Sequence, residues 1–356
     1  PMACNLPEVA YLKNFVKIPV VCAGKMNDPD IAVHAVESGM VDGVGIARAL
    51  LSDPEWCDKL RAGHLDDIRP CIGCHNGCFP ISRFKGNPCG FGHMGACAIN
   101  PVTMHEKEFE LRPAPVKKKI AVIGGGIGGM EAARLCALRG HSVTLYEKSG
   151  RLGGVFVAAA APDFKEHDKA LIKWYIKQLK DLNVPVKLNT EITGDMLNTL
   201  DADEIVVATG SVPKKLPVPG FDGKNTIEAI DYLLDNKKAG NNVVIIGGGL
   251  TGCEIAYDLA LKGKKATIVE MQDDILKING LSAANSEFLR EAIRYHDIKV
   301  HISSALKEIK TDGVVIETET GAQFIPADSV ILSVGYNSHN PFQTASGNVH
   351  VLGDAN

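Results

Sequence analysis

An α/β fold divided among several domains is predicted for this chain on three observations. Strand-like and helix-like segments alternate over residues 1–63, and a glycine-rich β-α-β pattern occurs at 117–148 and again at 241–271. Between the opening segment and the first of these patterns, residues 69–115 are rich in Cys, Gly and Pro and lack periodicity. The length of 356 residues is enough for two or three domains.

The first 63 residues have the pattern of a β-α-β-α series. Strands are predicted over 18–22 and 41–46, and helices over 28–39 and 53–62. Two strands do not form a stable sheet alone, so we expect further strands upstream. The chain also stops directly after a β-like run at 349–352, where an α/β domain normally adds a helix, so we expect truncation at both ends.

The two β-α-β patterns keep one register, without insertion or deletion. Each of four residue pairs is separated by 123 positions, which indicates a duplicated unit. The pairs are Gly124 with Gly247, Glu131 with Glu254, Gly140 with Gly263, and Glu147 with Glu270.

In each repeat an apolar strand, predicted at 120–123 and at 243–246, runs into a G-x-G-x-x-G loop that opens a helix. The first glycine permits a tight turn, the second lets the backbone approach a pyrophosphate, and the third allows close helix packing. Glycines also serve ordinary turns, but strand, helix and duplication together favour dinucleotide binding. The candidate residues are Gly124, Gly126 and Gly129, and Gly247, Gly249 and Gly252.

An acidic residue completes each candidate nucleotide site. Glu147 and Glu270 lie 23 residues after the first glycine of their loops, near the spacing at which a carboxylate accepts from ribose hydroxyls. Because Glu270 would repel a 2′-phosphate and no Arg follows at 271–274, we predict NADH rather than NADPH. Glu131 and Glu254 are expected in the first helical turn, with no role beyond the helix dipole.

The cysteines indicate a metal site. Cys71, Cys74 and Cys78 lie within eight residues, and Cys89 and Cys97 follow. Four thiolates can bind an iron–sulfur cluster or zinc. The two separated C-x2-C pairs of a zinc ribbon are absent from the sequence, so iron–sulfur is the favoured interpretation, zinc is the alternative, and a disulfide is the weakest option.

The composition excludes several classes of protein. With 45% apolar and 22% charged residues the chain is typical of a globular protein. A net charge of -4 leaves no basic field for phosphates, so we expect no nucleic-acid partner. No apolar run approaches the roughly 20 residues of a membrane helix, and no secretory signal pattern opens the chain, so we expect a cytoplasmic protein without a membrane partner.

Residues 117–356 resemble the two-dinucleotide flavoprotein reductases, in which FAD occupies the first unit and NAD an inserted second one. The turn after Glu147 is similar to the family's second pyrophosphate-contacting turn, and two further Gly-containing turns are similar to its strand-end and ribityl contacts. The resemblance implies FAD contacts at Gly154, Thr209, Gly210, Gly353 and Asp354.

The whole chain resembles the NADH:flavin oxidoreductases of the 2-enoate reductase and 2,4-dienoyl-CoA reductase type. In that family an Old Yellow Enzyme-like (β/α)8 barrel with FMN precedes a [4Fe-4S] cluster and FAD and NAD(P)H domains. The resemblance implies cluster ligands at Cys71, Cys74, Cys78 and Cys97. The 18 residues between the last two exceed the family's usual spacing, and Cys89 competes as the fourth ligand.

The resemblance also divides the chain. It implies that Ala23 with Gly24, and Ala47 with Arg48, belong to FMN-phosphate loops after strands seven and eight of the barrel. The catalytic residues are then expected upstream of this chain. The expected domains are the barrel end (1–66), a cluster segment (67–117), an FAD domain (118–220 with 325–356) and an inserted NAD domain (221–324).

The function that the resemblance implies is NADH-dependent ene-reduction. Electrons would pass from NADH to FAD, to [4Fe-4S], to FMN and to a small-molecule substrate with an activated alkene. Two alternatives stay open from the sequence: an amine dehydrogenase of the trimethylamine type, and a non-catalytic redox module. The identity of the alkene, and the choice between a monomer and a homo-oligomer, are not decided by the sequence.

Overall fold

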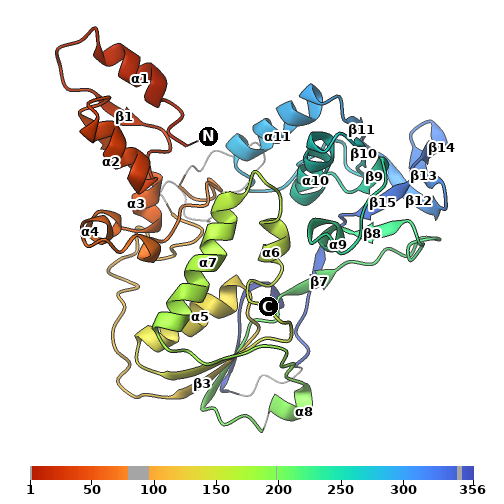
Figure 1. The fold of residues 1–356 in the computed structure, drawn as a ribbon. Coiled ribbons are helices and arrows are strands. Elements are labelled where there is room, and N and C mark those ends of the chain that lie inside the picture. The colour runs from red at the N-terminus through yellow and green to blue at the C-terminus, as the bar shows by residue number, and fades with distance from the viewer. Residues whose placement is uncertain (1, 79–95, 198, 343–346) are drawn as a thin grey trace.

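The computed structural model describes residues 2–78, 96–197, 199–342 and 347–356. Three parts are visible in Figure 1: an N-terminal segment of short helices with two strands, a unit built on a five-stranded sheet, and a second unit of the same kind inserted into the first. The predicted α/β class and the two Rossmann-like units are therefore confirmed, whereas a barrel is not directly visible in the described chain.

The N-terminal segment contains one parallel strand pair. Its strands are shorter than predicted, and α2 begins where expected because Asp28 Oδ1 accepts from the Ile31 N–H at 3.0 Å and Pro29 occupies the first turn. A short helix begins at Arg48, where we predicted a loop. The elements are α1 (Leu6–Lys13), β1 (Val21–Ala23), α2 (Pro29–Glu37), β2 (Gly43–Gly45), α3 (Arg48–Ser52), α4 (Trp56–Arg61) and the 3-10 helix η1 (Leu65–Asp67).

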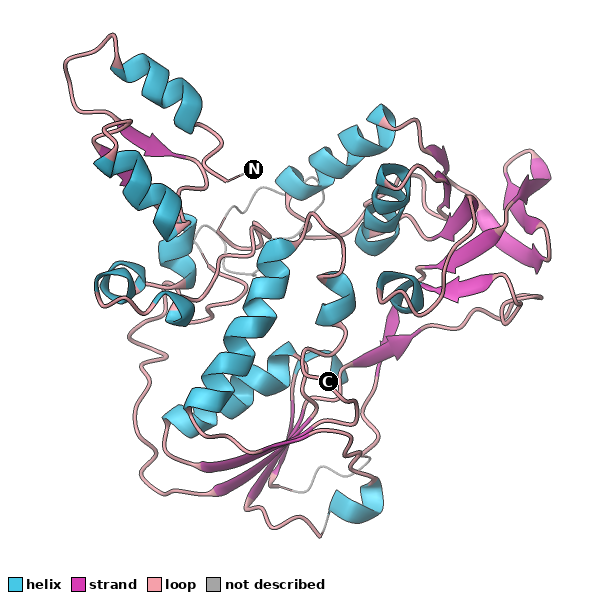
Figure 2. Ribbon diagram, in the orientation of Figure 1, coloured by secondary structure: helices cyan, strands magenta, loops and turns pink. Residues whose placement is uncertain are grey.

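The first nucleotide unit is a five-stranded parallel sheet of order β17-β6-β3-β4-β5. Its central strands are continuous apolar runs because both faces are covered, and α5 and α7 lie over one face (Figure 2). Its elements are β3 (Lys119–Ile123), α5 (Ile127–Leu138), β4 (Ser142–Tyr146), α6 (Phe156–Ala159), α7 (Glu166–Asp181), β5 (Val186–Lys187), α8 (Gly194–Leu197), β6 (Glu204–Val207), β17 (Val349–Val351) and the 3-10 helix η2 (Gly353–Ala355).

The second nucleotide unit has the order β11-β10-β9-β15-β8 and repeats the arrangement of four strands of the first, while its fifth strand, β8, precedes β9 in the chain. Duplication in sequence is thus duplication in fold. Its sheet and helices are β8 (Thr226–Glu228), α9 (Ala229–Leu233), β9 (Asn242–Ile246), α10 (Leu250–Leu261), β10 (Lys265–Val269), α11 (Ala283–Tyr295), β11 (Lys299–His301) and β15 (Ser329–Leu332), and an antiparallel sheet adds β12 (Ala305–Lys310), β13 (Gly313–Thr318) and β14 (Gly321–Pro326).

One predicted boundary differs from the strand pairing. The expected division at residue 325 assigned β15 to the first unit, but β15 pairs with β9 on one side and β8 on the other. The return to the first unit therefore follows Leu332. The chain crosses between the units as an antiparallel pair, β7 (Ser211–Pro213) with β16 (Tyr336–Ser338).

The first nucleotide unit is joined to the N-terminal segment by α7. Trp174 Nε1 donates to the Asp67 carbonyl at 3.0 Å, and Lys177 pairs with the Asp67 carboxylate at 2.5 Å. Arg69 lies over the Trp174 ring, 4.7 Å from its centroid, and also donates to the Ile99 carbonyl at 2.8 Å. Within the described residues, no helix has both the length and the apolar character needed to cross a membrane.

Candidate functional site

The first glycine loop follows β3 and has the geometry that the fingerprint requires. Gly124 has φ +108°, and a Cβ there would lie 2.3 Å from the Ala208 carbonyl oxygen. A Cβ at Gly129 would lie 1.9 Å from the Gly124 carbonyl oxygen, so the helix packs directly on the turn. At Gly126, in contrast, nothing lies within 4 Å, which leaves the backbone open to a ligand.

The second loop has the same construction. Gly247 has φ +106°, and a Cβ on Gly252 would lie 2.0 Å from the Gly247 carbonyl oxygen. The nearest atom to a Cβ on Gly249 is 3.9 Å away. Both loops therefore present an open middle glycine in front of a helix N-terminus, where unpaired N–H groups attract phosphate.

The two expected acidic residues are buried and hold their loops. Glu147 accepts from the N–H groups of Gly125 and Ser149, both at 2.7 Å. Glu270 accepts from the Gly248 N–H at 2.6 Å and from the Gln272 N–H at 2.8 Å. Since each carboxylate oxygen has a second lone pair, these bonds leave acceptor capacity for ribose hydroxyls.

The other predicted FAD contacts lie at the same edge of the first sheet. Gly126 forms a bridge with Gly153, so Gly154 lies beside the glycine loop. Thr209 and Gly210 follow β6, next to the turn made by Gly124, and Gly353 with Asp354 follows β17. Because carboxyl ends of parallel strands meet at one edge, these segments lie together along one edge of the first sheet.

Glu131 and Glu254 do not lie in the first helical turn, and that prediction is wrong. Helices α5 and α10 begin at Ile127 and Leu250, so both carboxylates lie beyond the first turn and are used in ion pairs. Glu131 pairs with Arg134 on its own helix at 2.8 Å. Glu254 pairs with Lys165 of the first unit at 2.7 Å, across the boundary between the two units.

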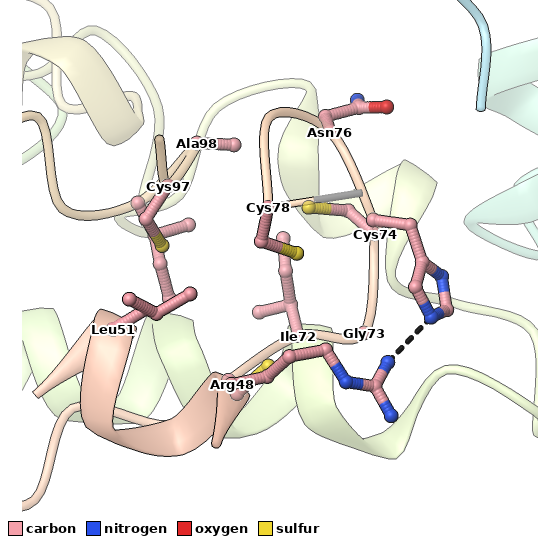
Figure 3. A pocket seen from close by; sticks show the side chains of 12 residues that line it. Arg48, Leu51, Ile72, Gly73, Cys74, Asn76, Cys78, Cys97 and Ala98 are labelled. Carbon is pink, nitrogen blue, oxygen red and sulfur yellow. Dashed lines mark hydrogen bonds between the residues drawn. The ribbon is translucent and has the colours of Figure 1, made fainter. Parts of the chain in front are cut away.

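The predicted cluster ligands Cys71, Cys74, Cys78 and Cys97 all line one pocket. Figure 3 shows the sulfur atoms of Cys74 and Cys78 beside each other, with the sulfur atom of Cys97 apart from them, near Leu51. The loop turns tightly because Gly73, His75 and Gly77 all have positive φ, at 69°, 56° and 98°. Cys89 lies outside the described residues, so the choice between it and Cys97 stays a prediction.

Two opposing effects act on the protonation of these thiols. Burial raises the pKa of Cys74 to about 11, and it also raises the pKa of Cys78 and of Cys97. Backbone N–H groups of Asn76, Ile99 and Asn100 act in the opposite direction. Such N–H groups stabilise thiolates and tune the potentials of iron–sulfur clusters. In the parts of the chain that are described, no three His, Cys, Asp or Glu side chains are grouped as a site for a single metal ion.

A second pocket brings the two predicted phosphate loops together. Ala23 is the last residue of β1 and Gly24 follows it. Ala47 and Arg48 follow β2, so all four lie at the carboxyl ends of adjacent strands. The wall that this pocket shares with the thiol pocket consists of Arg48, Cys71 and Gly73.

One residue of the phosphate pocket, His167, was not predicted. His167, from the first turn of α7, lines the pocket together with Lys25. Burial lowers the pKa of His167, and the charge of Lys25 adds to that effect. No sequence signal marks His167, because it reaches the pocket only through the packing of α7 against the N-terminal segment.

Comparison with known proteins gives consistent relatives. Cinnamate reductase of Clostridium sporogenes is 41% identical over 356 residues, covering 99% of this chain and 52% of that protein. NADH oxidase of Thermoanaerobacter brockii is 34% identical, covering 97% of this chain and 53% of that protein. The solved complex of 2-naphthoyl-CoA reductase with 2-naphthoyl-CoA is 30% identical with a TM-score of 0.91, covering 99% of this chain and 54% of that one.

The chain thus spans about half the length of these relatives. They confirm the resemblance that the cysteine spacing and the paired glycine loops predicted. A model of the pyridine nucleotide-disulphide oxidoreductases matches residues 94–197 and 118–351. The chain therefore belongs to the pyridine nucleotide-disulphide oxidoreductase family.

Proposed function

We propose that this chain is part of an NADH-dependent ene-reductase, which reduces a carbon–carbon double bond conjugated to a carbonyl group. When bound, NADH, FAD, a [4Fe-4S] cluster and FMN supply a path that carries two electrons from nicotinamide to alkene. The similarity to cinnamate reductase and 2-naphthoyl-CoA reductase supports this reaction class. None of the described residues is proposed to bind or protonate the alkene.

Each nucleotide unit has its own proposed ligand. The first unit would hold FAD, with its pyrophosphate over the open Gly126 and its ribose at Glu147. The second would hold NADH in the same way, over Gly249 and at Glu270. The remaining proposed contacts are Gly124, Gly129, Gly154, Thr209, Gly210, Gly353 and Asp354 for FAD, and Gly247 and Gly252 for NADH.

The single observation that carries the proposal is the shared wall between the thiol pocket and the phosphate pocket. Cys71 faces both spaces, so a cluster bound by the four thiols would lie directly beside an FMN whose phosphate is held by Arg48. On its other side, Ile72 of the thiol loop and Cys97 pack against the core of the first nucleotide unit, which would hold FAD. A thiol site with only a structural role would not need to lie between the sites proposed here for FAD and FMN.

Anaerobically purified full-length protein tests the proposal. We expect iron, acid-labile sulfide, FMN and FAD to be recovered, and NADH to bleach the flavin absorbance. With cinnamate as a probe alkene, NADH oxidation should match saturated acid formed. Zinc without iron or sulfide would contradict the cluster, and absence of flavin bleaching by NADH would instead favour the amine dehydrogenase, which passes electrons outward from its substrate.

A further inference from the structure

Arg48 has an unusual position, because it lines both pockets. On one side it shares the phosphate pocket with Gly24 and Lys25, and on the other it lies among the residues around the four thiols. Lys25, the other cation of the phosphate pocket, does not line the thiol pocket. Within the described residues, Arg48 is therefore the cation common to the two sites.

The guanidinium of Arg48 is held by the thiol loop itself. Its Nη1 hydrogen-bonds to His75 Nε2, drawn as the dashed line in Figure 3. His75 follows Cys74 directly, and the same stretch of backbone is tied to α11 through the bond from Asn285 to the Cys74 carbonyl. Arg48 is thus anchored to the loop that would carry the cluster as well as to the strand end that would carry the phosphate.

A fixed positive charge at this place acts on both ligands. Arginine stays charged at every accessible pH and offers paired donors to a phosphate. Arg48 also lines the thiol pocket, so its charge lies next to the site of the four thiols. Adding an electron makes a thiolate-bound cluster more negative, so a nearby cation favours the reduced form.

We propose that Arg48 has two functions: it binds the FMN phosphate, and its positive charge raises the reduction potential of the adjacent cluster. In the second function Arg48 is a positioning and tuning residue rather than a catalytic one. The proposal rests on the cluster and FMN sites of the proposed function. Its central feature is the shared wall formed by Arg48, Cys71 and Gly73.

The test compares full-length wild type, Arg48→Gln, Arg48→Lys and the control Lys25→Gln. FMN content is measured, and the cluster is titrated against potential by electron paramagnetic resonance. Every variant is titrated without FMN, beside FMN-depleted wild type, so that loss of flavin does not itself change the reading. Arg48→Gln should lower FMN affinity at least tenfold and lower the reduced-to-oxidised ratio of the cluster about tenfold at fixed potential, which is 59 mV for a one-electron couple.

The control variants separate the two functions. Lys25→Gln should weaken FMN binding but leave the cluster titration at the wild-type position, and Arg48→Lys should weaken FMN binding while keeping most of the cluster potential, because it keeps the charge. An unchanged cluster potential in Arg48→Gln, or an equal shift of that potential in Lys25→Gln, would overturn this inference but would leave the proposed function standing. A wild type without iron and labile sulfide would overturn the proposed function, and this inference with it.

Discussion

Lys165 and Glu254 join the two nucleotide units through an ion pair of 2.7 Å, although they lie far apart in the sequence. Both side chains are mostly buried, at 18% and 15% exposure. A second carboxylate, Asp168, lies close enough for Lys165 and Glu254 to affect its pKa. The ammonium group of Lys165 therefore pairs with Glu254 and acts electrostatically on Asp168 at the boundary between the units.

We predict that this shared site makes stability depend on pH through Asp168. Burial, with Glu254 adding to it, raises the pKa of Asp168 to about 6, while Lys165 acts in the opposite direction. Since the ordinary value is 3.8, the folded protein binds the proton more tightly than the unfolded chain. Its contribution is therefore most favourable below about pH 4, and it is lost as the pH rises towards about 6.

The substitution Asp168→Asn should remove the free-energy cost of keeping this buried carboxylate charged above about pH 6. Allowing for the partial exposure of the carboxylate, we expect the free energy of unfolding to rise by about 1 kcal/mol above pH 6 and to be unchanged below about pH 4. Urea unfolding of variant and wild type between pH 4 and pH 8 measures the difference. Asp163→Asn, an exposed carboxylate nearby, is the control and should match wild type at each pH. A gain that is independent of pH would contradict the assignment.

Loss of the cluster is predicted for Cys97→Ser. The thiol of Cys97 lines the pocket with the other three, and a serine hydroxyl is a poor ligand for iron at neutral pH. We expect at least half of the iron and sulfide to be lost, together with the visible absorbance of the cluster. Cys136→Ser, a partly buried thiol on α5 that does not line the pocket, should keep full iron content. Iron retained in Cys97→Ser but lost in Cys89→Ser would move the fourth ligand to Cys89.

The sequence predicted the two nucleotide loops well, because the residues that define each loop are neighbours in the chain. A strand, three glycines at fixed spacing and a helix start lie within about ten residues, so Gly124 and Gly247 identify their turns without any tertiary knowledge. The joint lining of one pocket by Cys71 and Cys97 depends on a longer loop, and it followed from the family resemblance rather than from periodicity.

Features that depend on packing between units were missed or misassigned. Lys165 and His167 carry no motif, and their roles arise only because the N-terminal end of α7 meets both α10 and the phosphate pocket. The apolar run of β15 reads equally well as a strand of either sheet, because burial on both faces gives the same pattern in each. The hydrogen bond between Arg48 and His75 likewise depends on tertiary packing, and no sequence motif predicts it.

A preference for NADH over NADPH follows from the surroundings of Glu270. The carboxylate is buried against its own loop, and the two nearest following cations are engaged elsewhere: Lys277 pairs with Asp273 at 2.5 Å, and Arg290 with Asp274 at 2.8 Å. A 2′-phosphate would therefore meet negative charge without a free cationic partner in this part of the described chain. We expect kcat/KM for NADH to exceed that for NADPH at least tenfold, a difference of about 1.4 kcal/mol.

The duplicated unit supplies a matched control for this preference. Glu270→Gln should lower the ratio of kcat/KM for NADH to kcat/KM for NADPH. The amide removes the negative charge but keeps one acceptor for the Gly248 N–H. Glu147→Gln, the equivalent change in the first unit, should weaken FAD binding and leave that ratio unaltered. Steady-state rates of flavin reduction give the ratios, and equal efficiency of wild type with both nucleotides would contradict the prediction.

The last prediction separates folding from ligand binding within one loop. In Gly129→Ala the added methyl group would lie 1.9 Å from the Gly124 carbonyl oxygen, so helix α5 must shift, and we expect a loss of stability of about 1–3 kcal/mol. In Gly126→Ala the methyl group enters open space, so the apoprotein should unfold within about 0.5 kcal/mol of wild type. That methyl would nevertheless occupy the place proposed for the pyrophosphate, and FAD affinity should fall more than tenfold. Urea unfolding of the apoprotein and FAD titration by fluorescence measure the two effects. Unimpaired FAD binding by Gly126→Ala would mean that the open space above this glycine is not where the dinucleotide lies.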